Sequence, residues 1–453
     1  MKNIETFHAL NRFGLGAAPG EAKTLGNDPR GWVKAQIVRH PVPEVFSWFS
    51  SSAEIIAAIH NARLAGPDEL RQATGDAYRK GFIPEVVARA RVMIGSDSPF
   101  AERMVMFWSN HFTVSNAKRI IGPAIPAYER EAIRPHVFGK FADMLKAVSR
   151  HPAMISYLDN FASMGENSLA GVRRKAKTGT EKTLNENLAR EILELHTLGV
   201  NGGYQQVDVI ELAKAITGWS HGGARLPFER QPVHGNFEYK HFFHEPGPKT
   251  VLGKTYRENG DQEGLDILED LALHPATAEF LATKLVRHFV ADDPSGAAVD
   301  AIASVYRDSG GDLAQVSRAL VDLEQAWASP LAKVKSHYEY VVAVHRATGH
   351  RQAKALDVLQ PLRDMGQLPF SATSPAGWGD EAKDWIAPEA LMRRIEWIHR
   401  YTANLSSGLD PLAELDDLMG PVVNDATRVT VQRAPTRKDA MALILASAEF
   451  QRR

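Results

Sequence analysis

The feature that most constrains this chain is a recurring signal for the start of a helix. Proline tolerates the first helical position because the N–H that it lacks would be unpaired there. A side chain that can cap a helix precedes such a proline in Asp28-Pro29, Ser98-Pro99, Asp293-Pro294 and Ser329-Pro330. The pattern returns with histidine as the cap in His151-Pro152 and His274-Pro275. Apolar residues at helical spacing follow each pair, so we expect a mainly α protein.

The predicted helices are spread along the whole chain. They cover residues 4–12, 29–39, 52–64, 68–94, 99–116, 124–134, 139–149, 152–158, 182–197, 206–218, 261–272, 275–290, 294–308, 312–323, 330–348, 388–403 and 437–447. Strand signal is confined to about 225–256, where glycines bound an alternation of apolar and polar residues. The apolar and aromatic positions of that alternation are Phe237, Tyr239, His241 and Phe243. The sequence predicts a multi-helix globular body with one small β-hairpin excursion.

These predicted elements suggest how the chain is divided into parts. We expect an N-terminal helical half at 1–220, a histidine-rich hairpin insert at 221–258 and a C-terminal helical half at 259–453. Short connections favour one integrated body over separate domains. Residues 163–181 and 366–387 hold several glycines with serine or proline, which predicts irregular backbone.

Each irregular stretch carries one notable feature. The run Arg173-Arg174-Lys175 is interpreted as a solvated loop, with contact to an anionic partner as the alternative. Trp378 and Trp385 lie in the second stretch, and we expect them to anchor it to the helical body.

Charge and cysteine content exclude several classes of function. The 53 Lys and Arg residues nearly balance 54 Asp and Glu residues, so we expect no nucleic-acid partner. Cysteine is absent, which excludes disulfides, thiol catalysis and thiolate-bound metals. No apolar run approaches the ~20 residues of a membrane span. The first residues carry no apolar signal segment and no twin arginine, so we expect a cytoplasmic protein, with the periplasm as the alternative.

Histidine is the most informative residue type here, because neutral imidazole is the commonest metal ligand and titrates near neutrality. Four histidines lie close together in the insert: His221, His234, His241 and His244. Of these we take His244 as the leading metal-ligand candidate. Neither His-Glu-x-x-His nor His-x-His occurs, so no standard metalloprotease motif supports it. In the alternative interpretation these side chains cap helices, satisfy buried carbonyls or lie in solvent.

His111 is the second metal-ligand candidate. It follows Phe107 on the apolar face of its helix, so its ring should be buried. A buried imidazole needs a partner, because an unpaired polar group costs ~1–3 kcal/mol. That partner is a carboxylate or carbonyl in the structural interpretation, and a metal or reacting group in the functional one. The candidate carboxylates are Glu191, Glu194 and Glu245.

The helix expected from 182 to 197 carries two acids and a histidine. Glu191 and Glu194 share one flank beside the buried stripe and are our candidate catalytic carboxylates. His196 lies on the other flank and is our third metal-ligand candidate. A site that used Glu191 and His196 together would need a bent helix end, for which Gly199 offers a left-handed cap. The alternative is a salt-bridged helix flank.

Three aromatic residues are candidates for binding a substrate. Trp108, Tyr204 and Trp219 lie near the polar candidates in the sequence, and aromatic faces stack on sugars or bases. In the alternative interpretation these rings belong to the core.

Several stretches in this order resemble the bacterial family known as domain of unknown function 1800. They are Ala9–Gly16, Glu102–Phe112, Asn185–Val200, Gly202–Tyr204, Ala215–Trp219, His244–Gly253, His274–Ala278 and Ala448–Arg453. The family has no established activity, so the resemblance implies no catalytic residue. It implies export beside a second uncharacterised protein, from which the N-terminus of this chain departs. Glu245 stands where the resemblance implies Asp, which keeps a carboxylate.

Two hypotheses follow from the residues. The first is a metal-dependent enzyme, a hydrolase or oxidoreductase, whose site gathers His111, Glu191, His196 and His244 around a divalent or transition metal ion. A glycan-active enzyme that uses Glu191 and a second acid is a variant of it. The second is a non-catalytic helical adaptor or assembly factor for the neighbouring exported protein.

Overall fold

The computed structural model describes residues 4–116, 121–179, 184–224, 233–405 and 410–453. The first helices are α1 Ile4–Phe7, η1 His8–Phe13, α2 Glu21–Thr24, α3 Pro29–Ala35, η2 Glu44–Trp48, α4 Ser52–Ala65, α5 Pro67–Asp76, η3 Ala77–Phe82, α6 Ile83–Gly95 and α7 Pro99–His111. Then come η4 Gly122–Ala124, α8 Ile125–Tyr128, η5 Glu129–Ile133, η6 Arg134–His136, α9 Phe141–Ser149, α10 Pro152–Tyr157, η7 Asn160–Ala162, α11 Leu169–Thr178, α12 Asn187–Glu191, η8 Ile192–His196 and α13 Gln206–Ala215.

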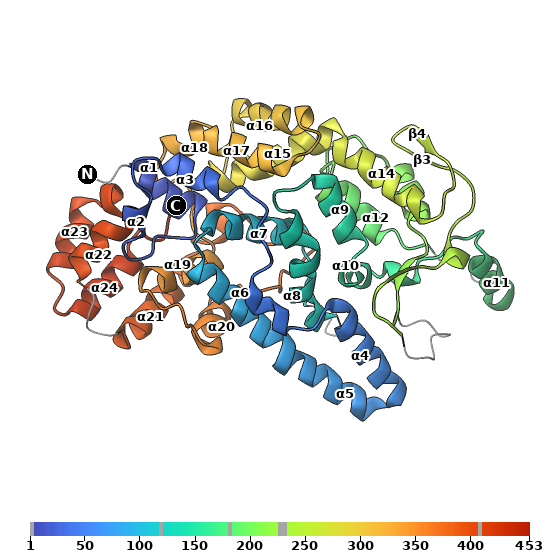
Figure 1. Ribbon diagram of the computed structural model, residues 1–453, viewed down its shortest axis with the longest axis horizontal. Coiled ribbons are helices and arrows are strands. Elements are labelled where there is room, and N and C mark those ends of the chain that lie inside the picture. The colour runs from blue at the N-terminus through green and yellow to red at the C-terminus, as the bar shows by residue number, and fades with distance from the viewer. Residues whose placement is uncertain (1–3, 117–120, 180–183, 225–232, 406–409) are drawn as a thin grey trace.

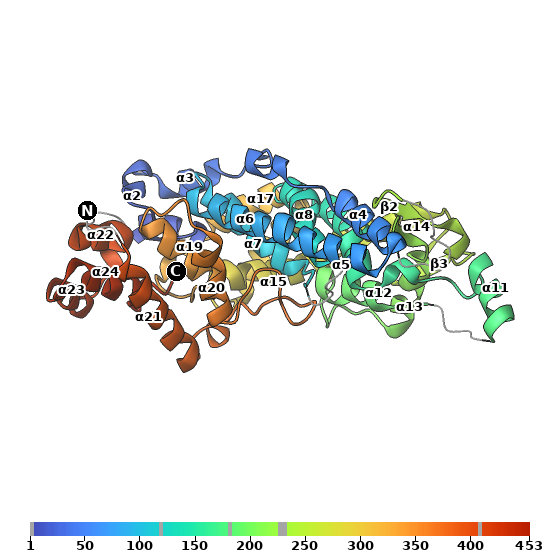
Figure 2. The same ribbon diagram turned by 90° about the horizontal axis from the view of Figure 1, so that it is seen from below.

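The later helices complete a mainly α fold, as predicted, with 63% of the residues in helices. They are η9 His241–Phe243, α14 Asp261–Leu273, α15 Pro275–Phe289, α16 Gly296–Asp308, α17 Leu313–Asp322, α18 Gln325–Ala328, α19 His337–Ala347, α20 Ala355–Asp364, η10 Ala382–Asp384, α21 Pro388–Ala403, α22 Pro411–Leu418, η11 Gly420–Val422, α23 Asp425–Gln432 and α24 Arg437–Ala446. The body is elongated, with α22 to α24 at one end and α11 at the other (Figures 1 and 2).

Capped helix starts are confirmed at three of the expected places. Asp28 accepts a hydrogen bond from the N–H of Gly31 at the start of α3. His151 and His274 cap α10 and α15, each by accepting a backbone N–H bond at Nδ1. These two histidines therefore have a structural role.

Two other starts differ in their caps. Ser98 precedes α7 without a side-chain capping bond. The side chain of Ser295, and not that of Asp293, caps α16. Both helices form at the expected place, because their apolar faces bury against the core.

The helix expected from Pro330 begins only at His337, so residues 330–336 were predicted wrongly. Those residues run beside the segment 451–453. The N–H of Lys333 donates to the Arg453 carbonyl oxygen at 3.1 Å, and the N–H of Arg453 donates back at 2.8 Å. Ser336 then caps α19 with a capping box. The strand-like pairing therefore overrides the local helix signal.

The irregular stretch predicted at 163–181 is also partly wrong, because residues 169–178 form α11. Residues 180 and 181 lie outside the described residues, as do the first two positions of the helix predicted at 182–197. The second stretch, 366–387, is irregular as predicted apart from the single turn η10.

Strands are small and lie near the predicted place. β1 Trp219–His221 pairs antiparallel with β2 Phe237–Tyr239, and β3 Lys249–Val251 pairs antiparallel with β4 Lys254–Tyr256. Residues 241–243, expected to continue a strand, form the turn η9 instead. Residues 225–232 of the predicted hairpin region lie outside the described residues.

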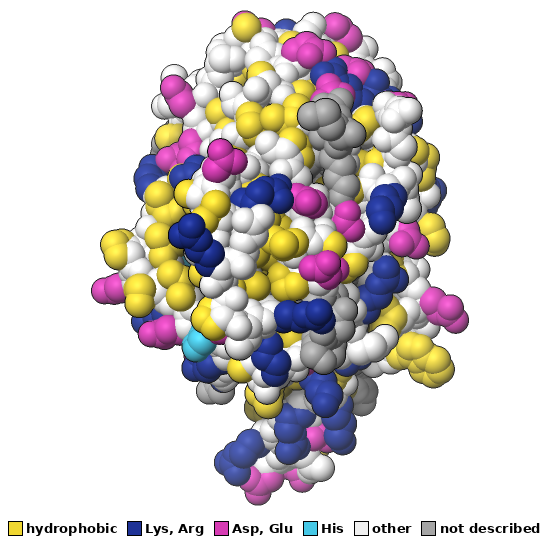
Figure 3. Space-filling view, turned by 90° about the vertical axis from the view of Figure 1, so that its left-hand side faces the viewer, with side chains coloured by type: hydrophobic (Ala, Val, Ile, Leu, Met, Phe, Trp, Pro, Cys, Tyr) yellow, Lys and Arg dark blue, Asp and Glu magenta, His cyan; other side chains and the backbone are white. Residues whose placement is uncertain are grey.

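Most buried apolar side chains belong to one core that runs from Ala9 to Phe450. A small second cluster joins Met164, Ala224 and Phe243 beneath α11. Figure 3 looks onto the end formed by α21 to α24, where hydrophobic side chains lie among charged ones of both signs. None of the helices in the described part of the chain is long and apolar enough to cross a lipid bilayer.

The N-terminal turn is joined to the far part of the chain through a buried arginine. Arg12 is fully buried in η1 and donates from NH1 to the Ala326 carbonyl oxygen at 2.6 Å. It also donates to the carbonyl oxygen of Ser329. These bonds join residues more than 300 positions apart.

Candidate functional site

A pocket of about 400 Å³ opens between α7, α15 and the irregular segment 366–387. The segment is held against α7 by Asn110, whose side-chain amide donates to the Trp378 carbonyl oxygen and accepts from the Trp378 N–H. Gly377 is needed at this contact, because a Cβ there would lie 2.5 Å from the Asn110 carbonyl oxygen. The segment 366–387 therefore forms one wall of the pocket.

Lys284 of α15 brings a positive charge into this pocket. Within the described ranges, no acid or hydrogen-bond acceptor pairs with its amino group, and its Nζ lies 5.5 Å from the ring centroid of Phe280. Burial lowers the pKa of Lys284 to about 8, although the charge of Asp380 raises it. The amine is therefore an unpaired base that titrates close to neutral pH.

Three of the four acids that line the pocket contact basic side chains, and the fourth, Asp384, accepts from the backbone N–H of Glu381 at 3.0 Å. Asp380 contacts His288 at 2.7 Å, between Oδ2 and Nδ1. Glu381 binds Lys383 at 2.6 Å, and Glu339 pairs with buried arginines. None of these carboxylates forms an ion pair with Lys284, although the charge of Asp380 acts on it from a distance, so the pocket presents a positive group without a direct partner.

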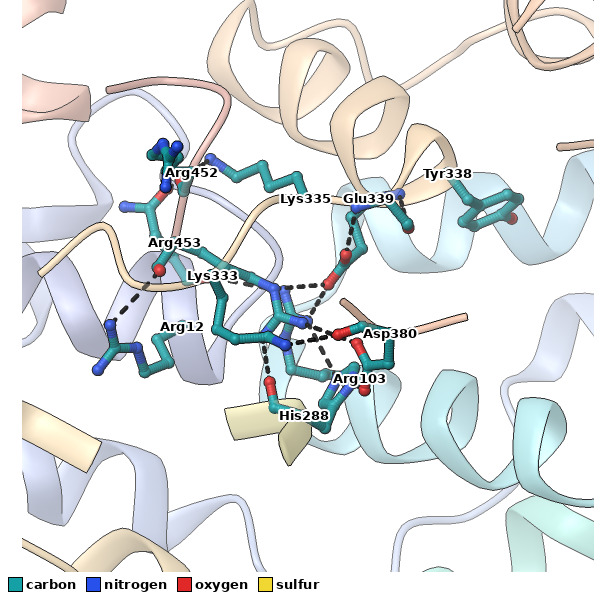
Figure 4. A network of polar contacts seen from close by, with 12 residues as sticks. Arg12, Arg103, His288, Lys333, Lys335, Tyr338, Glu339, Asp380, Arg452 and Arg453 are labelled. Atoms are coloured by element: carbon teal, nitrogen blue, oxygen red, sulfur yellow. Dashed lines mark hydrogen bonds and ion pairs between the residues drawn. The ribbon is translucent and has the colours of Figure 1, made fainter. Parts of the chain in front are cut away.

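Figure 4 shows the ion network behind the pocket. Glu339 of α19 pairs with Arg103 of α7 and lies 3.1 Å from Nε of Arg453. Arg103 also donates to Nε2 of His288 at 3.4 Å, and His288 contacts Asp380 through its other nitrogen. Burial lowers the pKa of His288. Both nitrogens of this ring are engaged, so His288 holds the wall in place.

His111 and His196 lie together next to Lys284. His111 is 1% exposed, as predicted, and its Nε2 donates to the His196 carbonyl oxygen at 3.1 Å. Its partner is therefore a carbonyl and none of the candidate carboxylates. Because a carbonyl only accepts, Nδ1 of His111 carries a bare lone pair, and it has no partner.

Burial is the main cause that keeps both imidazoles neutral. It holds the pKa of His111 well below its usual value and lowers that of His196 to about 3, and the charge of Lys284 adds to both shifts. His196 ends the π-helical turn η8. Gly199 follows with φ +80°, and a side chain there would strike the ring of Phe280. The residue that caps this helix end is Thr197, with φ −128°, so Gly199 does not provide the expected left-handed cap.

His244 lies in a different place from this pair. Its Nδ1 donates to the Thr217 carbonyl oxygen at 3.1 Å, and its Nε2 lies 3.3 Å from Nζ of Lys249 and 3.2 Å from Glu263. Lys249 itself lies 3.0 Å from Glu263, and all of these side chains are buried. The structure places His244 in an ion triad that joins the insert to α14.

Glu191 and Glu194 lie with Tyr204 outside the pocket. The hydroxyl of Tyr204 donates to Glu194 at 3.2 Å. Glu191 is half-buried, and burial together with the charge of Glu194 raises its pKa. The structure therefore brings the two candidate acids and Tyr204 together, but none of them lines the pocket.

Trp108 and Trp219, expected to contact a substrate, are fully buried in the core. Trp219 packs closely on Gly264, where a Cβ would lie 2.5 Å from the indole. With no exposed ring face, neither indole is placed to stack on a ligand in this structure. Trp385 is buried against His337 and anchors the segment 366–387, as expected.

Comparison with known proteins supports the resemblance seen in the sequence. A family model described as "Protein of unknown function (DUF1800)" matches residues 8–452. The chain belongs to the DUF1800 family. No curated protein and no solved structure is significantly similar to it.

A metal site in this DUF1800 protein stays a prediction. In the ranges that the structure describes, no three His, Asp or Glu side chains are grouped so that they could hold a metal ion. His111 and His196 are adjacent, with ring centroids 6.2 Å apart and an unpartnered Nδ1 on each. His244 is engaged elsewhere, so a ligand set would need a donor from outside this group.

Replacing His111 with Ala is expected to lower the free energy of unfolding by ~1–3 kcal/mol, because the His196 carbonyl oxygen loses its buried donor. His111→Gln should recover part of this loss, since an amide N–H can replace the imidazole donor. Denaturant titration of both variants measures the effect. Elemental analysis of the same samples tests the metal hypothesis: stoichiometric metal that His111→Gln loses while keeping its stability would make His111 a ligand.

Proposed function

We propose that this DUF1800 protein is an enzyme for a small, negatively charged substrate, with its active site in the pocket between α7, α15 and the segment 366–387. One observation carries the proposal: Lys284 lines the pocket, and within the described residues none of the acids around it forms an ion pair with its amino group. Lys284 is partly buried, and a partly desolvated charge without a partner is costly, so an anionic ligand at this place is favoured.

Lys284 would have two tasks in this enzyme. In its charged form the amine binds the carboxylate or phosphate group of the substrate. Because its pKa is lowered to about 8, a fraction of the amine is neutral near physiological pH and can accept a proton. The neutral ring of His111 lines the pocket beside it, and Trp378 and Phe107 supply apolar surface to the bound molecule. The metal-dependent and adaptor hypotheses stay predictions.

Binding of simple anions tests the proposal. Acetate, succinate, citrate and inorganic phosphate are titrated by calorimetry, with acetamide as the neutral comparison. We expect at least one anion to bind, and Lys284→Met to weaken it at least tenfold, about the value of one charge-assisted hydrogen bond. The matched control is Lys383→Met, which removes a lysine that lines the same pocket but is already paired with Glu381.

The pH dependence of binding adds a second readout. Lys284 loses its charge as the pH rises through about 8, so anion affinity should fall above that pH in the wild type and stay flat in Lys284→Met. The proposal is wrong if no anion of the panel binds, or if Lys284→Met and Lys383→Met bind it equally well.

A further inference from the structure

α11 is a short helix that is held firmly at its beginning and projects from one end of the molecule (Figures 1 and 2). The carboxylate of Glu245 accepts bonds from the backbone N–H and the side-chain amide of Asn167, at 2.9 and 2.5 Å. Ser168 then caps the helix by accepting from the N–H of Gly171. This base ties α11 to the segment between η9 and β3.

The first turn also packs against the body. Gly171 is buried so close to the preceding loop that a Cβ would lie 2.2 Å from the Gly165 carbonyl oxygen. Ala170 covers the small apolar cluster beneath the helix. From Val172 to Thr178 every side chain is exposed. Several specific contacts therefore hold the beginning of α11 against the body, while its later turns stay exposed to solvent.

The outward surface of α11 combines an apolar ridge with positive charge. Leu169 is 62% exposed and Val172 is 55% exposed. With Ala176 they are spaced three and four residues apart, so they share one face of the helix. The cations on the exposed part of the helix are Arg173, Arg174, Lys175 and Lys177. No acid occurs between residues 169 and 178.

Most of the positive charge of α11 forms no ion pair among the described residues. Arg173, Arg174 and Lys177 form no ion pair with any residue that the structure describes. By contrast, the basic residues of α5 and η3, such as Arg71 and Arg79, pair with Asp68 and Asp76 on their own helix. Arg173, Arg174 and Lys177 are therefore available to an outside partner.

We propose that α11 binds the surface of an anionic phospholipid membrane. A helix that lies in a membrane interface presents apolar residues flanked by Lys and Arg, whose aliphatic stems pack on the acyl boundary while their charges meet lipid phosphates. Leu169 and Val172 form a ridge and not a groove, which suits a flat, deformable surface. The position of α11 at the tip of the long axis lets it reach such a surface ahead of the body.

Co-sedimentation with lipid vesicles tests this surface. The full chain is mixed with vesicles of phosphatidylcholine alone and of phosphatidylcholine with phosphatidylglycerol, at low and high salt. We expect binding only to the anionic vesicles, and weaker binding at high salt. Reversing three charges in Arg173→Glu/Arg174→Glu/Lys177→Glu should lower the affinity at least tenfold, since each basic residue near an anionic surface contributes about 1 kcal/mol.

The matched control reverses three cations elsewhere on exposed helices, in Arg71→Glu/Arg79→Glu/Lys80→Glu. It changes the net charge equally, and we expect it to bind anionic vesicles as the wild type does within about twofold, because these residues lie outside α11. If both triple variants lose binding to the same extent, the attraction comes from net charge and the proposal is overturned. Circular dichroism confirms that each variant is folded.

The apolar ridge is tested separately. Leu169→Ser/Val172→Ser should weaken binding while leaving the charge unchanged, and the emission of Leu169→Trp should shift to shorter wavelength when anionic vesicles are added. Polyglutamate is the probe for the alternative partner, an acidic polypeptide. Binding to polyglutamate with no binding to anionic vesicles, or vesicle binding that is insensitive to Leu169→Ser/Val172→Ser, would overturn the proposal.

Discussion

Arg103→Met is expected to lower the free energy of unfolding by about 3–5 kcal/mol, because it leaves the buried carboxylate of Glu339 with one cation fewer. Arg103 is 1% exposed and also donates to the Gly14 carbonyl oxygen at 2.7 Å. Its removal therefore costs both an ion pair and a buried hydrogen bond between distant parts of the chain. Denaturant titration measures the change.

A surface arginine supplies the control. Arg71 pairs with Asp68 at 3.1 Å, but both side chains are more than 80% exposed. Arg71→Met should therefore change stability by less than about 0.5 kcal/mol. Equal losses in the two variants would contradict the role given to the buried network.

The same network predicts a pH dependence. Burial alone would raise the pKa of Glu339, but the charges of Arg453 and Arg103 hold it well below the ordinary value of 4.5. A carboxyl group with a depressed pKa stabilises the folded state above its unfolded pKa and loses that contribution as the pH falls. The stability gap between wild type and Glu339→Gln should therefore be widest near neutral pH and narrow below pH 4.5. A gap that widens in acid would contradict this assignment.

Glu263→Gln is expected to have an effect of similar size, about 3–5 kcal/mol, because it leaves the charge of Lys249 buried and unpaired. Glu263 and Lys249 are both at most 1% exposed, and their charged atoms lie 3.0 Å apart. The neighbouring His244 supplies no negative charge, because its Nδ1 donates to the Thr217 carbonyl oxygen and its Nε2 lies 3.3 Å from Nζ of Lys249. Thermal and denaturant unfolding of the full chain measure the loss.

Two further variants separate charge from packing at this triad. Lys249→Met/Glu263→Leu removes both charges and should recover most of the stability. Asp270→Asn breaks the more exposed pair between Asp270 and Lys254, on α14 and β4, and should cost less than about 1 kcal/mol. A double variant that is no more stable than Glu263→Gln would show that the triad contributes through shape and not through charge.

Local signals predicted much of the helical fold, because helix starts and apolar stripes are short-range properties. His274 caps α15 and Pro275 begins it, as the sequence indicates. The sequence also carries signals for the helix α11, with Ser168 as its N-cap and Gly179 after its end. The glycines and serines around it nevertheless favoured an irregular loop. The helix predicted at residues 330–336 was wrong for a different reason. Their partner is the segment 451–453, and no local pattern reports a pairing across that distance.

The sequence predicted the burial of His111, while the site roles of the candidate residues stay predictions. The contact between His111 and His196 joins two of the three histidines proposed as ligands, since both lie on buried faces of their helices. Lys284 was missed, because a lysine on the flank of an amphipathic helix ordinarily points into water. Its pocket exists only because the segment 366–387 folds over α15, as the contact of His288 with Asp380, 92 residues away, shows. A pocket wall formed by two segments so far apart in the chain cannot be predicted from local sequence patterns.

The buried Arg12 has a consequence for synthesis of the chain. Its acceptor on Ala326 lies 314 residues further along. At about 5–20 residues per second the ribosome delivers that acceptor some 15–60 s after Arg12 itself. During this interval Leu10 and Phe13, which share the turn η1, have no complete core to enter. We expect the nascent N-terminus to need a holding chaperone and to dock among the last elements.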